Sequence, residues 1–189
     1  SQQKYLDIIL FETDRLTKLT SNLLDVNNFD KDNIFLDISR FNLHDSIRKT
    51  AGALEGVAAK KDIHFDLELS DTEPLWVSGD KDKIQQVLHN LMDNAVKFSH
   101  EGSSILVSTR EKGNRVFVSV KDSGIGIPKD DLGKIFERFY KTDLSRGKDK
   151  LGTGLGLSIC KEIITAHKQN LDVVSTEGVG SEFVFTLTK

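Results

Sequence analysis

Two glycine clusters and a carboxylate mark the segment of this chain whose residue types and spacing are suited to chemistry. Asp122 opens the run DSGIGIP, and residues 152–159 read GTGLGLSI. Asp122 ends the alternating run RVFVSVKD, which is typical of a strand. A carboxylate there can accept a hydrogen bond from an exocyclic amine, while Gly124 and Gly126 allow the backbone to approach a flat ring closely. These residues indicate a nucleotide pocket.

The second glycine cluster opens a segment with helical spacing. Its apolar residues at 155, 157, 159, 163 and 164 predict a helix with one buried face. Free backbone N–H groups at a glycine-rich helix start bind phosphates, helped by the helix dipole. The chain has no G-x-x-x-x-G-K-[ST] motif, and neither cluster has the third glycine of G-x-G-x-x-G. The spacing therefore excludes the Walker and dinucleotide-binding loops.

A third group lies upstream, in KIQQVLHNLMDNAVKFS (residues 83–99), where the apolar residues follow helical spacing. Asn90, Asn94 and Lys97 are four and three residues apart, so they share a second face of that helix. Amide oxygens can complete a magnesium shell otherwise made of water and phosphate. The ammonium group of Lys97 offsets phosphate charge. Together these residues predict a site for a metal-bound triphosphate.

The elements that must position these groups follow from periodicity and turn residues. The pattern predicts a two-layer α/β sandwich, in which a mixed, mostly antiparallel sheet lies under one helical layer. A long helix precedes it in residues 1–28, residues 29–33 form a polar linker, and residues 34–189 form the globular domain. Asn42 and Asp80 are the expected N-caps of two helices. The expected strands cover residues 34–39, 63–69, 76–77, 103–110, 115–122, 171–176 and 182–187, and the further helices cover 43–60, 83–99, 128–135 and the segment after 154.

Composition limits the class of protein. The 189 residues are 38% hydrophobic and 29% charged, enough for one packed domain and an appendage. A net charge of −3 gives no support to nucleic-acid binding. The single cysteine, Cys160, excludes an internal disulfide and lies in an apolar helical pattern, which favours a packing role. No apolar run reaches the roughly 18 residues of a membrane span. Because the chain begins inside a helical pattern, we expect it to be part of a longer protein.

The motifs, in their order, resemble those of the ATP-binding catalytic domain of bacterial sensor histidine kinases. These kinases belong to the Bergerat-fold (GHKL) superfamily, shared with gyrase, a heat-shock protein family and MutL. NLMDNAVKFS resembles the N box, DSGIGIP the first glycine box, IFERFYKTD the F box and GTGLGLSI the second glycine box. The resemblance covers roughly residues 40 to 189. It implies ATP and Mg²⁺ as cofactors and transfer of the γ-phosphoryl group to a protein histidine.

The resemblance also implies roles for single residues. The carboxylate of Asp122 would accept the adenine amino group, and Asn94 would be the magnesium ligand, with Asn90 possible as a second. Asn90, Lys97 and Lys141 would form the catalytic set. Lys141 stands where many members have arginine, so the charge is kept but the planar fork is lost. The implied ATP-binding residues are Asn90, Asn94, Lys97, Asp122, Gly124, Gly126, Ile127, Phe136, Phe139, Tyr140, Lys141, Gly152, Thr153, Gly154, Leu155, Gly156 and Leu157.

Residues 140–151 resemble the lid that covers the nucleotide in this family. The stretch KTDLSRGKDK is polar and highly charged, which predicts mobility without nucleotide. In the family, the residues that correspond to Phe136 and Phe139 anchor the lid to the domain, so packing and function coincide there. The run AHKQNLDV stands where the family usually has a Gly-Gly turn, remote from the four boxes.

The long first helix resembles the second helix of the dimerisation and phosphoacceptor hairpin of these kinases. Two overlapping apolar stripes between residues 6 and 26 suit a helical bundle, although a helix folded back on its own domain is the alternative. No segment resembles the histidine-bearing H box, and His44 is interpreted as a surface position at a helix start. The resemblance implies a homodimer through the hairpin, a response-regulator receiver domain as partner, a cytoplasmic location, and membrane attachment only through other parts of the parent protein.

Two other functions stay open at this point. In gyrase-like and MutL-like ATPases, the position of Asn90 carries a glutamate that activates water, and asparagine cannot act as that base. The second alternative is a non-catalytic nucleotide-sensing module, in which ATP only orders the lid. A substantial steady-state ATPase rate would favour the first alternative, and ATP binding without phosphoryl transfer would favour the second.

Overall fold

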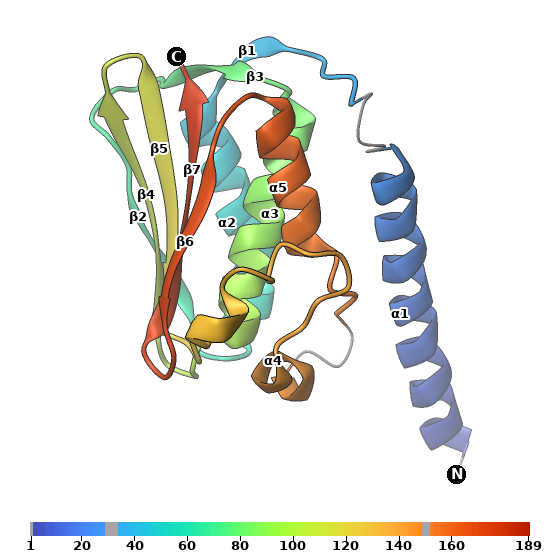
Figure 1. Ribbon diagram of the computed structural model, residues 1–189. Coiled ribbons are helices and arrows are strands. Elements are labelled where there is room, and N and C mark those ends of the chain that lie inside the picture. The colour runs from blue at the N-terminus through green and yellow to red at the C-terminus, as the bar shows by residue number, and fades with distance from the viewer. Residues whose placement is uncertain (1, 29–33, 149–151) are drawn as a thin grey trace.

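The computed structural model describes residues 2–28, 34–148 and 152–189. A mixed seven-stranded sheet is covered on one face by three helices, α2 (Leu43–Ala59), α3 (Lys81–Phe98) and α5 (Gly156–Ala166) (Figure 1). The other face of the sheet carries no helix in the described residues. This arrangement confirms the predicted two-layer α/β sandwich, and the apolar core lies between the sheet and the helical layer.

The strand order in the sheet is β1-β3-β7-β5-β4-β2, with β6 paired to β7. Among the described strand pairs, β2 and β4 run parallel and the others antiparallel, which confirms the expected mixed, mostly antiparallel sheet. The pairing of β5 with β7 places Ser181 opposite Asp122, where β5 ends. The strands are β1 (Ser39–Asn42), β2 (His64–Glu68), β3 (Trp76–Gly79), β4 (Ser104–Lys112), β5 (Arg115–Asp122), β6 (Leu171–Thr176) and β7 (Gly180–Thr188).

Both predicted N-caps are present. The side chain of Asn42 accepts a hydrogen bond from the backbone N–H of His44 at 3.2 Å. Asp80 does the same for the N–H of Lys83, also at 3.2 Å. Such caps satisfy N–H groups that a helix start leaves without intrahelical partners. Buried residues at the predicted helical spacing then bind α3 to the sheet: Ile84, Val87, Leu88, Leu91, Met92 and Ala95.

Two predicted element boundaries are wrong. The strand expected at residues 34–39 lies at Ser39–Asn42, where it pairs with β3. Phe35 is 91% exposed, and the backbone N–H of Asp37 is bonded to Asp80 rather than to a strand. The helix expected from Pro128 through Ile135 is only a 3₁₀ turn, η1 (Lys129–Asp131), followed by further turns. The helical pattern at 128–135 reflects the single buried residue Ile135, and the alternating pattern at 34–39 reflects the half-buried Ile34 and Leu36.

The prediction for His44 is also wrong, because its side chain is fully buried. Its Nδ1 lies 3.1 Å from Oε2 of Glu73, and its Nε2 lies 2.8 Å from Oγ1 of Thr109. Hydrogen bonds from Arg48 and then His44 lower the pKa of Glu73 to about 2. Both partners of His44 are far away in the chain, so no local pattern could indicate them. This cluster holds α2 against β4 and lies outside the residues of the site described below.

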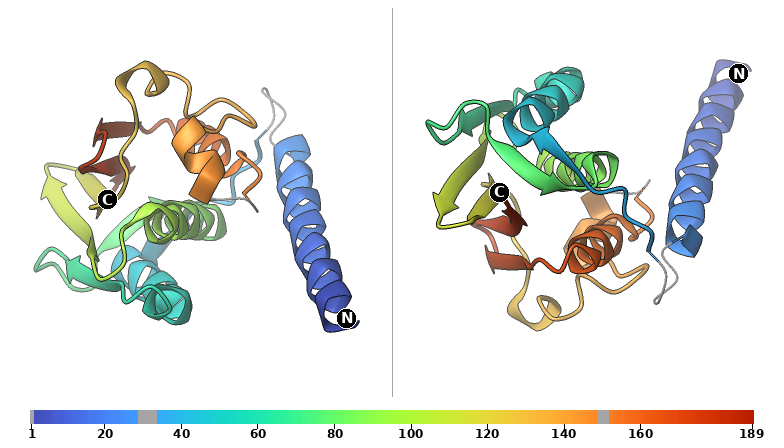
Figure 2. Two further views of the ribbon diagram at one scale, coloured as in Figure 1. Left: turned by 90° about the horizontal axis from the view of Figure 1, so that it is seen from below. Right: turned by 90° about the horizontal axis from the view of Figure 1, so that it is seen from above.

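Helix α1 (Gln2–Asn28) lies alongside the helical layer and contacts α5. Both views in Figure 2 place it outside that layer, separated from the sheet. Of its described side chains, Leu19 alone is half-buried, and the others are exposed. None of the described helices is long and apolar enough to cross a membrane. The exposed apolar side chains of α1 are Tyr5, Leu6, Ile8, Ile9, Leu10, Phe11, Leu16, Leu23 and Leu24.

Candidate nucleotide site

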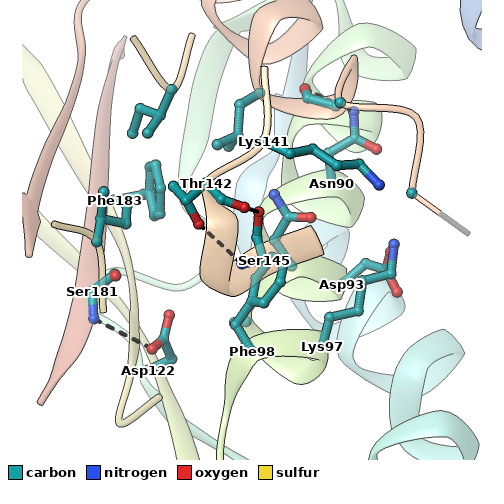
Figure 3. Close-up of a pocket in the computed structure, with 18 of the residues that line it drawn as sticks. Asn90, Asp93, Lys97, Phe98, Asp122, Lys141, Thr142, Ser145, Ser181 and Phe183 are labelled. Carbon is teal, nitrogen blue, oxygen red and sulfur yellow. Dashed lines mark hydrogen bonds and ion pairs between the residues drawn. The ribbon is translucent and has the colours of Figure 1, made fainter. Parts of the chain in front are cut away.

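A cavity of about 310 Å³ opens between α3, the start of α5, the end of β5 and the segment from residue 140 to 145 (Figure 3). It therefore brings together the three groups of residues that the sequence singled out. Thirteen of the seventeen expected ATP-binding residues line it. Gly124, Phe136, Phe139 and Leu155 are not among its lining residues. Those that line it are Asn90, Asn94, Lys97, Asp122, Gly126, Ile127, Tyr140, Lys141, Gly152, Thr153, Gly154, Gly156 and Leu157.

Asp122 lies at the sheet side of the cavity and is only 8% exposed. Its Oδ1 accepts hydrogen bonds from the backbone N–H groups of Gly124 at 2.9 Å and Ser181 at 3.3 Å. Figure 3 shows the bond to Ser181, which comes from the neighbouring strand β7. Burial raises the pKa of the Asp122 carboxyl, against the opposing effect of these two bonds. The side chain is thus a fixed acceptor at the end of the central strand β5.

Gly124 and Gly126 are required by close backbone contacts. A Cβ on Gly124 would lie 2.1 Å from the carbonyl oxygen of Phe98, at the end of α3. A Cβ on Gly126 would lie 2.1 Å from the carbonyl oxygen of Thr176, and its φ of +68° is unfavourable for other residues. Three backbone segments meet at this turn, which explains the glycines without a direct ligand contact from Gly124.

The α3 side of the cavity contains Asn90, Asn94 and Lys97, the three residues expected on one face. Nδ2 of Asn90 donates a hydrogen bond to the carbonyl oxygen of Gly156 at 3.4 Å, which links α3 to the start of α5. Nζ of Lys97 lies 3.0 Å from Oδ2 of Asp93. His89 and Asp93 also line the cavity, although neither is among the expected site residues. The four-residue spacing of Asp93 and Lys97 was the available signal for the ion pair.

The lid segment contains a helix that its polar composition did not predict, α4 (Asp143–Lys148). Oγ1 of Thr142 accepts a hydrogen bond from the backbone N–H of Ser145 at 3.0 Å and caps this helix. The hydroxyl of Tyr140 donates to the carboxylate of Asp131, which raises the pKa of Tyr140 to about 12. Residues 149–151 of the expected lid lie outside the described part. The mobility of the lid remains a prediction.

The two phenylalanines of the expected anchor differ. Phe136 packs against the core, where its ring meets Phe183 edge to face with 6.4 Å between centroids. Phe139 is 57% exposed and has a φ of +63°. Its backbone N–H donates to the carbonyl oxygen of Gly154 at 2.9 Å, so it joins the two ends of the lid through the main chain. Phe183 itself lines the cavity, and its position on β7 could not be inferred from the four motifs.

Cys160 of α5 and Leu155, which directly precedes α5, are core residues rather than reactive or cavity-lining groups. Both are fully buried. Burial raises the pKa of the Cys160 thiol to about 12, which keeps the thiol protonated and inert. The predicted packing role of Cys160 is confirmed. Within the described residues no group of three or more His, Cys, Asp or Glu side chains is arranged to hold a metal ion. Oxygen donors for a hard cation are nevertheless present in the cavity, on the amides of Asn90 and Asn94.

The chain as a whole has counterparts among known proteins. Residues 79–189 match the family described as histidine kinase-, DNA gyrase B- and HSP90-like ATPases. The chain belongs to this family. Its relatives include the sensor histidine kinase WalK of Bacillus subtilis, which is 38% identical over 97% of this chain and 30% of WalK. The chain therefore spans less than a third of the length of that relative.

Solved structures extend the likeness to the whole fold. The histidine kinase ThkA, solved in complex with the response regulator protein TrrA, has a TM-score of 0.79 and 32% identity. The match covers all of this chain and 52% of that one. Full-length ShkA, solved in complex with AMPPNP, has a TM-score of 0.85 and 28% identity, covering all of this chain and 39% of that one. The Bergerat fold expected from the sequence is thereby confirmed, and the likeness includes α1.

Proposed function

We propose that this chain is the ATP-binding catalytic region of a sensor histidine kinase, joined to part of its dimerisation hairpin. The observation that carries the proposal is the convergence of Asp122, Asn90, Asn94, Lys97 and the second glycine cluster on one cavity. In the parent protein, the bond between the γ-phosphorus of ATP and its bridging oxygen would break. A bond to a histidine nitrogen would form, and ADP would leave. The phosphoryl group would then pass to an aspartate of a response-regulator receiver domain.

The two ends of the cavity suit the two ends of ATP. Asp122 is held by backbone donors through Oδ1 and offers a charged acceptor to the adenine amino group. A hydrogen bond to a charged group contributes about 1.5–3 kcal/mol. At the other end, the free N–H groups at the start of α5 and the ammonium groups of Lys97 and Lys141 suit the phosphates. The protein's contribution would be positioning and charge stabilisation.

The residues present fit a magnesium ion that accompanies ATP. Mg²⁺ is usually held by one or two protein oxygens and by the phosphates and waters around it. Asn94 would supply such an oxygen, with Asn90 as the second candidate, because both line the cavity on the same face of α3. The ion would neutralise charge on the phosphates. The carboxylate of Asp93 is paired with Lys97, so we assign it to holding that lysine in place.

The acceptor histidine would come from outside the described site. Helix α1 contains no histidine. His44 is buried, and both ring nitrogens of His167 are hydrogen-bonded to backbone groups of Asp80 and Ile163. The exposed apolar side chains of α1 fit the second helix of a hairpin that forms a homodimer in the parent protein. We place the region on the cytoplasmic side, where ATP and response regulators are found.

Calorimetric titration with ATP and ADP, with and without magnesium, tests the site directly. The second stage mixes the chain with a version extended upstream through its histidine helix. That partner carries Asp122→Ala, and ATP is kept at a concentration that saturates the wild-type chain but not this weaker-binding variant. We expect magnesium-dependent ATP binding and labelling of the extended partner by [γ-³²P]ATP. A matched control replaces the acceptor histidine of the partner by glutamine and abolishes the label.

Each other outcome decides against a specific part of the proposal. If the chain does not bind ATP, the whole assignment is contradicted. Binding without labelling contradicts kinase activity and favours a nucleotide-sensing module. Rapid steady-state hydrolysis without a partner favours a gyrase-type ATPase, which the amide at Asn90 argues against because it cannot act as a base.

A further inference from the structure

The cavity has one lining residue that belongs to neither the globular domain nor the four motifs. Lys18, on helix α1, lines it together with residues of α3, α5 and the lid. Its neighbour Leu19 is half-buried, whereas the other described side chains of α1 are exposed, and α1 contacts α5. The helix is therefore docked near Lys18 rather than merely connected through the chain.

The position of α1 indicates which end of the cavity Lys18 faces. Asp122 lies on the sheet, whereas α1 lies on the far side of the helical layer, next to α5 (Figures 1 and 2). The start of α5 is the glycine-rich end to which Asn90 is hydrogen-bonded. Figure 3 likewise separates Asp122 and Ser181 from Asn90, Asp93 and Lys141 across the cavity. Helix α1 thus lies on the α5 side of the cavity, the side proposed for the phosphates, and Lys18 is the residue of α1 that lines the cavity.

We propose that Lys18 is a phosphate-contacting residue, so that the nucleotide site is completed by the hairpin helix. This inference rests on the proposed ATP site and adds a residue from a second structural unit to it. Nζ of Lys18 lies 3.0 Å from Oδ2 of Asp14, and both side chains are about half exposed. An exposed ion pair of this kind is weak, because water screens both charges. The higher charge of a triphosphate competes for the ammonium group successfully.

A composite site of this kind couples nucleotide binding to the position of α1. When α1 is docked, Lys18 adds a positive charge beside the phosphates, and ATP is bound more tightly. By thermodynamic linkage, ATP then favours the docked position of α1 by the same factor. Any movement of the hairpin that withdraws Lys18 weakens ATP binding and frees the domain from the helix. The hairpin thus regulates the site through a direct contact with its ligand.

The experiment is a set of titrations of the full chain with Mg-ATP and with AMP, at low and high salt. Lys18→Gln removes the charge and keeps the length of the side chain. We expect it to weaken Mg-ATP binding about three- to tenfold at low salt, as expected for one exposed charge near a polyanion. The loss shrinks at high salt. Binding of AMP, which has a single phosphate, changes less than twofold on the same reasoning.

Two further variants separate a local contact from a general charge effect. Lys4→Gln removes the same charge from an exposed position on the same helix, away from the cavity, and leaves ATP affinity at the wild-type value. Asp14→Asn releases Lys18 from its ion pair and tightens ATP binding, by roughly twofold. Asp122→Ala serves as the reference for loss of the proposed ATP site itself.

The outcomes are distinguishable. If the wild-type chain binds ATP and Asp122→Ala binds it at least about tenfold more weakly, the proposed ATP site stands. If wild type and Lys18→Gln then bind ATP with equal affinity, the proposed role of Lys18 is overturned and the proposed ATP site is not. An equal loss in Lys4→Gln, or an equal loss for AMP, also overturns it, because the effect would not be local to the phosphates. A wild-type chain that binds no ATP overturns both inferences.

Discussion

The two ends of the cavity are built by different means. The Asp122 end rests on central strands of the sheet, and its carboxylate is held by backbone N–H groups from two separate segments. The other end, proposed for the phosphates, includes α4, a helix of six residues in a polar segment, and Lys141, a half-buried lysine. The first end depends on contacts between residues distant in the chain. The second depends mainly on local hydrogen bonds such as that between Thr142 and Ser145.

This difference suits the two parts of the ligand. The adenine ring has a fixed shape and a single polar edge to recognise, so a preformed acceptor binds it without ordering cost. The terminal phosphate must be held and then released as part of a reaction. A short polar helix with few buried contacts has low local stability and can rearrange between these steps. Substitutions at the two ends should therefore differ in kind as well as in size.

The largest expected effect is at the rigid end. We expect Gly126→Ala to lower the free energy of unfolding by about 3 kcal/mol, because a Cβ would meet the backbone of Thr176 at a positive φ. Gly133→Ala is the control, since its Cβ meets nothing within 4 Å. Urea denaturation followed by circular dichroism measures both. Equal stability of Gly126→Ala and wild type would show that this turn rearranges freely, contrary to a rigid end.

Asp122→Ala should abolish recognition of the base with a smaller effect on folding. The loss of a charged acceptor corresponds to about 10- to 100-fold weaker ATP binding. The variant should also lose its preference for ATP over GTP, which lacks the exocyclic amine at the same position. Calorimetry with both nucleotides measures these changes. An unchanged ratio of the two affinities would remove Asp122 from the recognition of adenine.

The raised pKa of Asp122 predicts how pH affects the same end. As pH falls through this pKa, the carboxylate is protonated, so ATP affinity should decline at a higher pH than for an ordinary aspartate. The free energy of unfolding should depend on pH in the opposite direction to the ATP affinity. Burial raises the pKa of the Asp122 carboxyl in the folded protein above its value in the unfolded chain. The protonated carboxyl therefore stabilises the fold at a pH below the pKa in the unfolded chain. This stabilisation is lost as the pH rises through the pKa in the folded protein. Unfolding curves of wild type and Asp122→Asn between about pH 3 and 7, the range in which carboxylates titrate, test the direction of this pH dependence.

Sequence reasoning succeeded where the evidence is local. The helical face that carries Asn90, Asn94 and Lys97 follows from spacing within one element, and the caps Asn42 and Asp80 follow from residue type. These features depend on residues fewer than ten positions apart. Periodicity is a reliable guide at that range.

Features set by distant residues could not be predicted in this way. His44 is buried because of Glu73 and Thr109, and Ser181 reaches Asp122 through the register of β5 and β7. Lys18 lines the cavity because α1 contacts α5. In each case the position of the residue depends on a partner that is remote in the chain. The residue type alone does not indicate that partner. The same dependence on distant contacts explains why the strand near residue 39 was placed too early.

At the phosphate end we expect graded effects. Lys141→Ala removes one charge near the terminal phosphate and should weaken ATP binding about fivefold, with little change for AMP. Lys141→Arg keeps the positive charge of the wild-type lysine and adds a planar guanidinium group. It should therefore match or exceed the wild-type rate of phosphoryl transfer. Stability should be unchanged in both variants, unlike Gly126→Ala. A loss of stability in Lys141→Ala would place this residue with the rigid end instead.

The smallest expected effect tests whether α4 is partly unfolded without ligand. Gly147 lies in this helix, its Cβ would meet nothing within 4 Å, and alanine favours a helix over glycine by about 1 kcal/mol. If ATP binding includes ordering of α4, Gly147→Ala reduces the ordering cost and tightens binding, by roughly twofold.

Gly52→Ala is the matched control for this last variant, because Gly52 lies in α2 with the same open surroundings, on a helix outside the cavity. It should raise the stability of the fold and leave ATP affinity unchanged. Isothermal titration of the two variants side by side isolates the contribution of the lid. If Gly147→Ala raises stability but not affinity, α4 is already formed before ATP binds. The two ends of the cavity would then be equally preorganised, and the difference between them would be one of exposure alone.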